Sequence, residues 1–353
     1  MEKMMKAAVL YAPADLRIED VNIPQLSTAD EVLINVKAAG ICGSDIDRIM
    51  HTGTYSFPTI PGHEFCGVVA RTGENAGDFK EGDRVVVAPI LPCDKCESCV
   101  QGNYGQCDNY SYLGSRTDGG MAEYVVAPKR NLVRMPDNMS FDEGASVEPA
   151  AVTLHGMRQI RVNAGDSVAV LGCGTIGLFA IQFAKIMGAT RIIAADIDET
   201  KLKFASKFGA SHCIDAGKTD TVEAIKKITG GKGVDIAIET AGSNITQEQS
   251  IRVTKKKGRV LLLGTAHKDV ILPPATFELI IRYELTIIGA WNSYSAPFPG
   301  IEWQAVMDYV ESGRLDIMSC ITNRISLEEL PETIVAMDKR SFFFNKVIIN
   351  MDQ

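Results

Sequence analysis

A glycine-rich turn between an apolar segment and a helical one constrains this chain more than any other feature. Residues 167–171 are apolar and lead directly into Gly172-Cys-Gly174-Thr-Ile-Gly177, and a stretch with one small, apolar face follows at 176–187. A strand, a tight turn and a helix in this order favour a doubly wound domain with a parallel sheet. Further apolar segments alternate with helical ones and extend the pattern, at 191–196, 234–239, 259–264 and 286–290.

The same turn predicts a dinucleotide site. Its glycines let the backbone approach a pyrophosphate, and the following helix offers free N–H groups to the phosphates. The predicted contacts come from Gly172, Gly174, Thr175, Ile176 and Gly177. Asp196 ends the next strand, where a carboxylate accepts bonds from ribose hydroxyls and repels a 2′-phosphate, so NAD is favoured over NADP, and Lys201 is within reach of the same ribose. The alternative is an unliganded glycine turn with Asp196 as a helix cap.

The first part of the chain has a different pattern. Short strands separated by Gly, Pro and Asp are expected at 6–11, 31–38, 67–72, 83–88 and 122–126. This spacing is typical of an all-β unit, a barrel or a sandwich. The pattern changes near residue 155, and periodicity leaves open whether the last sixty residues belong to the first part or the second.

Length and charge limit the classes of protein and partner. A chain of 353 residues exceeds the size at which one core stops growing, so two domains are expected. A net charge of −8 argues against nucleic acid or an anionic membrane as the main partner. No apolar run approaches the roughly 20 residues needed to cross a bilayer, so a cytoplasmic protein is expected.

Four of the nine cysteines lie within fifteen residues, at Cys93, Cys96, Cys99 and Cys107. Four thiolates on one short loop can close a tetrahedron around zinc and leave no open position, which predicts a structural site. An iron–sulfur cluster or reduced surface thiols are the alternatives.

A second set of ligand types is spread over the first 150 residues. Cys42 lies in Gly-Ile-Cys-Gly-Ser-Asp, His63 and Glu64 lie in Pro-Gly-His-Glu-Phe, and Glu148 lies in Ser-Val-Glu-Pro. A thiolate, an imidazole and one or two carboxylates suit zinc with an exchangeable position. Taken singly, each residue also fits a structural role, because the spacing does not prove that they meet.

Taken together, these motifs resemble those of the medium-chain zinc alcohol dehydrogenases over essentially the whole chain. The four-cysteine lobe, the two ligand motifs, Asp118-Gly-Gly-Met-Ala-Glu-Tyr124 and the glycine turn occur in that family's order. The resemblance implies a GroES-like catalytic domain at 1–154 and 292–353, with the zinc lobe at 93–107. It also implies a Rossmann NAD-binding domain at 155–291.

The resemblance implies roles as well. It predicts an enzyme with two zinc ions per subunit that acts as a homodimer or homotetramer. Cys42 and His63 would hold the catalytic zinc. Glu64 and Glu148 would exchange at the catalytic zinc, so that one binds the metal while the other lies close to it. Ser44 would be the first proton carrier, as the hydroxyl residue that the family has there.

Within the family, the chain is similar to the polyol branch, because Glu148 stands where other members have a second cysteine. Four segments resemble members that oxidise galactitol 1-phosphate to tagatose 6-phosphate, namely 113–120, 275–277, 284–286 and 289–303, and the last of these carries the most weight. Sorbitol dehydrogenases carry an arginine where this chain has Asn292. Arg48 and Arg116 are the candidates to bind a phosphate. The alternatives are sorbitol or L-iditol, 2,3-butanediol and L-threonine.

Two other readings of the family pattern conflict with these residues. A zinc-free reductase or a non-catalytic dinucleotide-sensing protein would lack the catalytic ligands, and this chain retains all four types.

Overall fold

The computed structural model describes residues 4–351, which divide into two compact units. Residues 4–148 and 294–351 form the first unit, and Pro149–Ser293 forms the second. The boundaries expected from the sequence, near 155 and 291, stand a few residues from these points, since helix α4 (Val147–Ile160) begins at the end of the first unit. Within the described range, no helix has the length and apolar character needed to cross a membrane.

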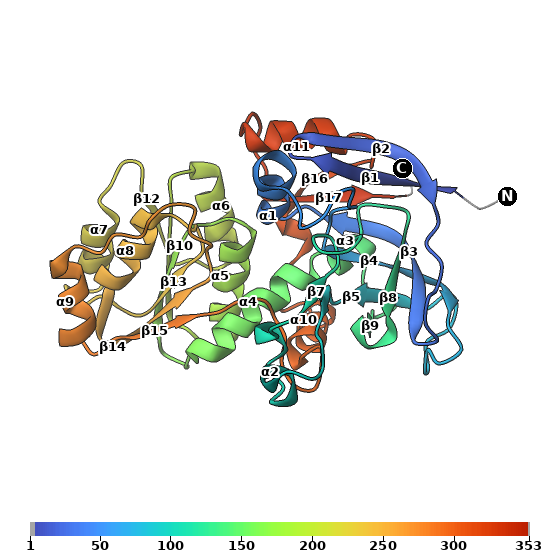
Figure 1. Cartoon of the computed structure of the whole chain (residues 1–353). Coiled ribbons are helices and arrows are strands. Elements are labelled where there is room, and N and C mark those ends of the chain that lie inside the picture. The colour runs from blue at the N-terminus through green and yellow to red at the C-terminus, as the bar shows by residue number, and fades with distance from the viewer. Residues whose placement is uncertain (1–3, 352–353) are drawn as a thin grey trace. The chain divides into compact units, whose positions relative to one another are not determined.

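The first unit is built on a seven-stranded sheet with the order β16-β17-β3-β4-β5-β9, in which β8 also pairs with β3 (Figure 1). Its strands are β3 (Glu31–Gly40), β4 (Glu64–Thr72), β5 (Arg84–Val87), β8 (Tyr124–Pro128), β9 (Leu132–Arg134), β16 (Ile321–Ile325) and β17 (Lys346–Asn350). Val32, Ile34 and Val36 of β3 are fully buried in its core. The all-β character expected for the first part of the chain is confirmed.

Two ribbons and several short helices complete the first unit. The ribbons pair β1 (Met4–Ala12) with β2 (Asp15–Asn22) and β6 (Ile90–Leu91) with β7 (Ser111–Tyr112). The helices are α1 (Gly43–Asp47), α2 (Glu97–Val100), α3 (Phe141–Gly144), α10 (Ile301–Glu311) and α11 (Leu330–Asp338), with shorter turns η1 (Arg48–Thr52), η2 (Tyr104–Gln106), η3 (Lys129–Asn131) and η4 (Met318–Cys320).

The C-terminal segment returns to the first unit. Strand β17 runs antiparallel to β3, with Ile348 opposite Gly40 and Asn350 opposite Ala38. β16 pairs with the other side of β17, so the sheet gains two strands from the end of the chain (Figure 1). This pairing answers the question that periodicity left open.

The second unit is a six-stranded parallel sheet with the order β12-β11-β10-β13-β14-β15. Its strands are β10 (Ser167–Leu171), β11 (Arg191–Asp196), β12 (His212–Asp215), β13 (Val234–Glu239), β14 (Thr254–Leu262) and β15 (Thr286–Gly289). Its other helices are α5 (Thr175–Ile186), α6 (Glu199–Phe208), α7 (Thr221–Ile228), α8 (Asn244–Arg252) and α9 (Pro274–Arg282). Figure 1 shows α5 and α6 on one face of this sheet and α7 to α9 on the other, which confirms the doubly wound fold.

The strand order of the second unit determines where a ligand fits. From β10 the chain builds outward to β11 and β12 and then crosses back to β13 on the other side of β10. At such a switch point, the loops after neighbouring strands diverge and leave a crevice at the carboxyl ends of the strands. The glycine turn follows β10 at this edge.

Candidate active site and metal centres

The pairing of β3 with β4 brings Cys42 and His63 together. Gly40, at the end of β3, lies opposite Glu64, at the start of β4, so residues about twenty positions apart meet at one end of the sheet. Each of Cys42, His63 and Glu64 offers a ligand atom, and these atoms all lie within 4.8 Å of one another. His63 and Glu64 are buried and Cys42 is half-buried. A sulfur, a nitrogen and an oxygen at this spacing fit a zinc ion with a position left for substrate.

Asp45 orients the imidazole of this cluster. Its Oδ1 lies 3.1 Å from His63 Nδ1, and its Oδ2 accepts the backbone N–H of Cys42 at 3.0 Å. Burial works against charge on both partners, but their mutual attraction prevails: the pKa of Asp45 is lowered and the pKa of His63 is raised well above its usual value. A carboxylate on Nδ1 leaves Nε2 as the ligand atom, which is how metal-binding histidines are commonly held. The sequence reasoning gave Asp45 no role.

The Cys42 thiol is prepared for metal binding by the same neighbours. Burial raises its pKa, but the charge and hydrogen bond of His63 outweigh burial and lower it to about 7. A thiol must lose its proton before it binds a metal, and with a pKa of about 7 Cys42 loses its proton near neutral pH.

Lys346 forms a buried ion pair with Glu64. Its Nζ contacts Glu64 Oε2 and donates to the Ile41 carbonyl at 3.2 Å, and both charged side chains are 2% exposed. A Cβ at Gly40 would lie 2.5 Å from Glu64 Oε2, so glycine there makes room for the pair. Burial lowers the pKa of Lys346 to about 8. The sequence reasoning missed Lys346, although a lysine that opens an apolar strand was a signal.

Glu148 lies near the cluster but outside its 4.8 Å limit. It is 6% exposed in the first turn of α4, and Tyr112 donates its hydroxyl to Glu148 Oε1 at 3.5 Å. Tyr112 also packs edge-on against the His63 ring, with the ring centroids 5.9 Å apart. Glu64 is therefore the carboxylate grouped with Cys42 and His63, and which carboxylate binds the metal at each step stays a prediction.

Glutamine at position 148 should stabilise the metal-free protein at high pH. Burial raises the pKa of Glu148 from 4.5 to about 7, so the stability that its neutral form contributes is present below pH 4.5 and lost as the pH rises through 7. At 1.36 kcal/mol per pH unit, chelator-treated Glu148→Gln should exceed chelator-treated wild type by about 3 kcal/mol at pH 8, and by less near pH 5. Urea unfolding at both pH values measures this, and an equal difference at both would contradict it.

Ser44 lies against the cluster. Its Oγ donates to Cys42 Sγ at 3.3 Å and accepts from Arg48 Nη1 at 3.0 Å. The predicted proton carrier thus sits beside a predicted metal ligand. The nearby His51 pairs at 2.8 Å with Asp338 in an exposed position, as a surface histidine would.

The 118–124 motif supports residues 60–62, which lead into His63 and β4 (Glu64–Thr72). Asp118 Oδ1 accepts the Ile60 backbone N–H at 2.9 Å, and the backbone N–H of Gly120 donates to the Gly62 carbonyl at 2.8 Å. A Cβ at Gly119 would lie 2.1 Å from the Gly62 oxygen. These glycines therefore allow two backbones to meet directly behind His63.

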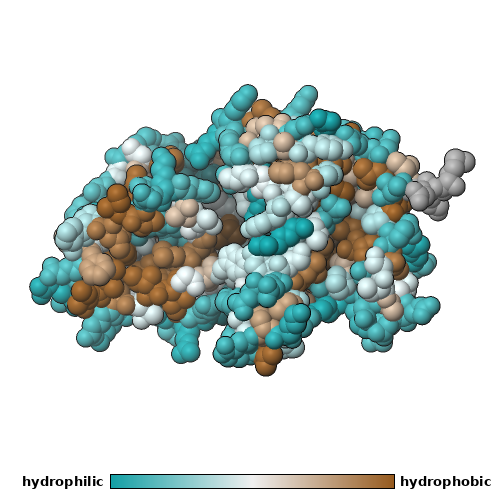
Figure 2. Space-filling view, viewed as in Figure 1, coloured by the Kyte–Doolittle hydropathy of each residue, from teal (hydrophilic) through white to brown (hydrophobic). Residues whose placement is uncertain are grey.

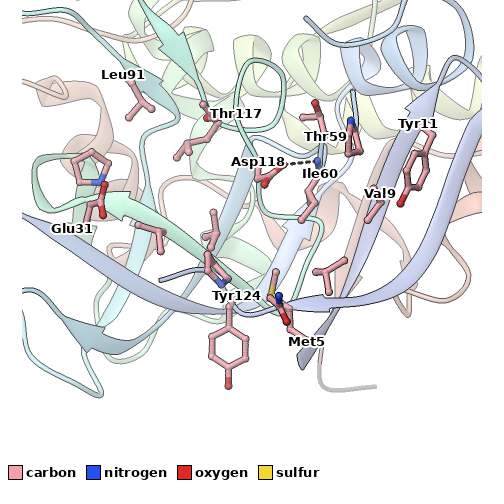
Figure 3. Close-up of a pocket in the computed structure, with 18 residues that line it drawn as sticks. Met5, Val9, Tyr11, Glu31, Thr59, Ile60, Leu91, Thr117, Asp118 and Tyr124 are labelled. Atoms are coloured by element: carbon pink, nitrogen blue, oxygen red, sulfur yellow. Dashed lines mark hydrogen bonds between the residues drawn. The ribbon is translucent and has the colours of Figure 1, made fainter. Parts of the chain in front are cut away.

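The Asp118–Ile60 bond also borders a cavity of about 500 Å³ that Figure 3 shows, lined mainly by β1, β2 and β8. Its lining includes Met5, Val9, Leu113 and Val125, and none of the predicted site residues is among the residues that form it. The cavity is therefore separate from the predicted chemistry.

The four cysteines of the 93–107 lobe come together, as their spacing predicted. The sulfur atoms of Cys93, Cys96, Cys99 and Cys107 all lie within 4.8 Å of one another, and Cys99 and Cys107 are buried. Backbone N–H groups, first that of Lys95, lower the pKa of the Cys93 thiol to about 6. Four sulfur ligands fill a tetrahedral zinc site completely, so this centre fits a structural metal.

The glycine turn of the second unit has the geometry of a phosphate-binding loop. Gly172 has a φ of +100°, and a Cβ at Gly177 would lie 2.0 Å from the Gly172 carbonyl oxygen, so both positions require glycine. Beside Gly174, a Cβ would meet nothing within 4 Å, and α5 begins at Thr175, followed by Ile176. Open space in front of a helix N-terminus fits a pyrophosphate.

Asp196 stands beside this turn. Its Oδ2 accepts the Cys173 N–H at 2.7 Å, and its Oδ1 accepts the Asp198 N–H at 2.9 Å. Lys201, in the first turn of α6, is half-buried nearby in sequence. These bonds place the Asp196 carboxylate at the turn that would hold the phosphates, as the NAD prediction requires.

Removing the Asp196 charge should shift cofactor preference. A carboxylate within about 5 Å of a 2′-phosphate costs several kcal/mol, so Asp196→Ala should raise the NADP-to-NAD ratio of kcat/KM roughly 100-fold. Steady-state kinetics with both cofactors measures the ratio. Asp198→Asn, which alters the neighbouring helix cap, is the control and should leave the ratio unchanged. An unchanged ratio in Asp196→Ala would remove Asp196 from the cofactor site.

The three predicted substrate residues lie in different places. Arg48 contacts Ser44 beside the cluster, and Arg116 lies between two tyrosine rings of the first unit. Asn292 belongs to the second unit and has a φ of +59°, a conformation that asparagine tolerates.

Comparison with known proteins shows the family to which this chain belongs. Residues 28–137 match the alcohol dehydrogenase GroES-like domain, and residues 175–312 match the zinc-binding dehydrogenase family. Galactitol 1-phosphate 5-dehydrogenase of Escherichia coli (strain K12) is 35% identical over 330 residues, which cover 94% of this chain and 95% of that protein. A crystal structure of galactitol-1-phosphate dehydrogenase from Escherichia coli matches 98% of this chain and 100% of its own with a TM-score of 0.93 at 34% identity.

Two further relatives have different names. Sorbitol dehydrogenase of Bacillus subtilis (strain 168) is 34% identical over 350 residues, or 98% of this chain and 96% of that protein. A putative zinc-binding dehydrogenase from Sinorhizobium meliloti 1021, solved bound to NADP, is 34% identical with a TM-score of 0.90 and covers 99% of this chain and 100% of its own. Both domain models and relatives that align over nearly the full length place this chain in the family of zinc-dependent medium-chain alcohol dehydrogenases.

Proposed function

We propose that this protein oxidises a secondary alcohol of a sugar alcohol phosphate, galactitol 1-phosphate, to the ketone tagatose 6-phosphate, with NAD⁺ as the hydride acceptor. The observation that carries the proposal is the buried cluster of Cys42, His63 and Glu64. In the reaction, the substrate carbon gives a hydride to NAD⁺ and its hydroxyl gives up a proton, so ketone, NADH and a proton form.

Bound zinc supplies a Lewis acid that lowers the pKa of the substrate hydroxyl, and bound nicotinamide accepts the hydride. The protein's own groups then have separate tasks. Asp45 fixes the His63 ring, and Ser44, 3.3 Å from Cys42 Sγ, takes up the departing proton. Glu148, with a pKa raised by burial to about 7, is poised to accept a proton or to join the cluster.

The choice of substrate is supported by the names of two relatives and by the positive charge of arginine side chains in the first unit. The relative at 35% identity is named for galactitol 1-phosphate, whereas another at 34% is named for sorbitol. Among residues 4–351, the Arg116 side chain makes no ion pair with a carboxylate. Arg48 donates to Ser44 Oγ, and its charge also acts on the buried Asp45 carboxylate. An arginine without a carboxylate partner, such as Arg116, favours an anionic substrate. Sorbitol or L-iditol, 2,3-butanediol and L-threonine remain the competing substrates.

NAD is the proposed cofactor because Asp196 would repel a 2′-phosphate. The relative that was solved with NADP represents the opposite choice. None of the nine cysteines, all of which lie within residues 4–351, forms a disulfide, which supports a reducing compartment, and we propose that this is the cytoplasm.

The zinc-loaded protein should form NADH, followed at 340 nm, with galactitol 1-phosphate in preference to galactitol, sorbitol, 2,3-butanediol and L-threonine. A kcat/KM at least a hundredfold higher for the phosphate corresponds to about 2.7 kcal/mol of transition-state binding. Equal rates with an unphosphorylated alcohol would refute the substrate. No NADH with any of these alcohols would refute the reaction itself.

We also propose that two copies associate through the β15 edge of the second unit. Among the described residues, β15 pairs with β14 alone, which leaves one side of its backbone open for pairing. Exposed apolar side chains surround this edge, and Figure 2 shows an apolar area over α9 and the neighbouring strands. These side chains are Val270, Ile271, Phe277, Ile281 and Ile287. An area of this kind marks an interface more often than a free surface.

Light scattering coupled to size exclusion tests the association. Wild type should have at least twice the mass of one chain, and Ile287→Lys should have the mass of one chain because a charge is costly at a paired edge. Val100→Lys changes an exposed apolar residue of the first unit and should keep the wild-type mass. A dimeric Ile287→Lys would exclude this edge.

A further inference from the structure

The Arg116 guanidinium lies over the rings of two tyrosines. Its guanidinium carbon is 3.9 Å from the ring centroid of Tyr55 and 4.5 Å from that of Tyr110. The backbone N–H of Tyr55 also donates to the Ser115 carbonyl at 3.1 Å, which ties the two loops together. Contacts with two rings restrict the guanidinium, and its N–H donors, which lie in the guanidinium plane, stay available for hydrogen bonds.

The charge of Arg116 is not neutralised by a carboxylate. Across residues 4–351, its side chain makes no ion pair or hydrogen bond, and its Nε is buried without a partner. Arg17 and Arg130 also lie over aromatic rings, but they pair with Asp15 and Asp94. A fixed arginine with an unused donor is suited to an anion, because a buried donor without a partner costs free energy that an acceptor recovers.

Arg116 and the rings of Tyr55 and Tyr110 together form what we call the arginine clamp. Aromatic contacts connect this clamp to the cluster of Cys42, His63 and Glu64. Tyr110 packs edge-on against Tyr112 with their centroids 6.3 Å apart, and Tyr112 packs against His63 at 5.9 Å. Tyr112 also donates to Glu148. The clamp therefore belongs to the same wall of the first unit as the cluster, a few side chains away from it.

We propose that Arg116, held by Tyr55 and Tyr110, binds the phosphate of the substrate and sets the preference for phosphorylated over free sugar alcohols. This inference rests on the proposed function, because it assigns the phosphate of that same substrate. Galactitol 1-phosphate carries its phosphate at the opposite end of the chain from the carbon that reacts. Recognition thus needs a fixed cation some distance from the metal, and the guanidinium fork matches two phosphate oxygens.

The decisive variants are Arg116→Met, which keeps an unbranched side chain without charge, and Tyr55→Leu, which removes one ring face. Arg116→Met should lower kcat/KM for galactitol 1-phosphate about 100-fold and leave kcat/KM for galactitol within twofold. Tyr55→Leu should lower the phosphate value roughly threefold to tenfold, as expected for loss of one stacking face, and Tyr55→Phe should restore it. Arg17→Met removes an arginine that is stacked and ion-paired, and should change neither value.

Each outcome bears on one claim. If Arg116→Met keeps the preference for the phosphate, this inference is overturned and the proposed substrate is unaffected. If Arg116→Met lowers kcat/KM equally for galactitol 1-phosphate and galactitol, the inference is also overturned, because an equal loss indicates a structural role. If wild type has no phosphate preference, the proposed substrate fails, and calorimetric titration of the NAD-loaded protein with inorganic phosphate decides about the clamp. Binding that Arg116→Met abolishes then supports an anion site, and absence of binding to wild type excludes it.

Discussion

Cys42→Ala is expected to lower kcat/KM about 10⁴-fold, because the proposed catalytic centre would lose its thiolate and with it the zinc that would activate the hydroxyl. Cys42 supplies one of three ligand atoms within 4.8 Å of one another. Elemental analysis should find one zinc per chain in place of two, since the four-cysteine lobe keeps its own. Far-UV circular dichroism should remain that of wild type.

Cys66→Ala is the matched control for this variant. Cys66 is also a buried cysteine of the first unit, but its thiol donates to the Phe141 carbonyl and belongs to neither cluster. It should keep two zinc ions and nearly full activity. Full activity or two bound zinc ions in Cys42→Ala would contradict the assigned centre.

Cys99→Ser should destabilise the protein by roughly 4 kcal/mol or more without altering the catalytic residues, because binding energy at a structural zinc site is folding energy. Cys99 is buried, and its sulfur is one of four that lie within 4.8 Å of one another. Urea unfolding gives the free energy, and elemental analysis should again show one zinc per chain. The zinc that remains should be the catalytic one, so activity at low temperature should persist.

Cys213→Ser, which changes an exposed cysteine of the second unit, is its control and should leave stability and zinc content as in wild type. An equally stable Cys99→Ser variant that retains two zinc ions would show that the lobe is not a structural metal site.

The parts of this fold that the sequence predicted well are those in which neighbouring residues share one role. The apolar strand at 167–171, the glycine turn and the following helix are consecutive, and the helix at 176–187 matches α5 to within a residue. The four cysteines are likewise contained in one short loop. Local patterns of this kind need no knowledge of the tertiary pairing.

Features created by pairing distant segments escaped prediction. Strand β2 has no buried residue, so its mixed polar sequence gave no period-two signal. Lys346 pairs with Glu64 because β17 lies against β3, a contact between residues 282 positions apart. The family resemblance, and not periodicity, supplied the grouping of Cys42 with His63, whose physical cause is the register of β3 and β4.

The segment 289–303, which carried the resemblance to galactitol 1-phosphate enzymes, is partly a packing element. Trp303 is 1% exposed, and Tyr294 is 3% exposed and stacks on both Trp303 and Phe298. Trp291 is about half exposed. Similarity in this segment therefore reflects a shared core at least as much as a shared substrate, and the arginine clamp carries the phosphate argument instead.

Product analysis tests the central claim most directly. Zinc-loaded protein should be incubated with galactitol 1-phosphate and NAD⁺. The product should be identified by NMR, and its amount compared with the amount of NADH formed. We expect one tagatose 6-phosphate for each NADH, and no NADH after the metal has been removed with a chelator. An undiminished rate without zinc, or oxidation confined to unphosphorylated alcohols, would contradict the account.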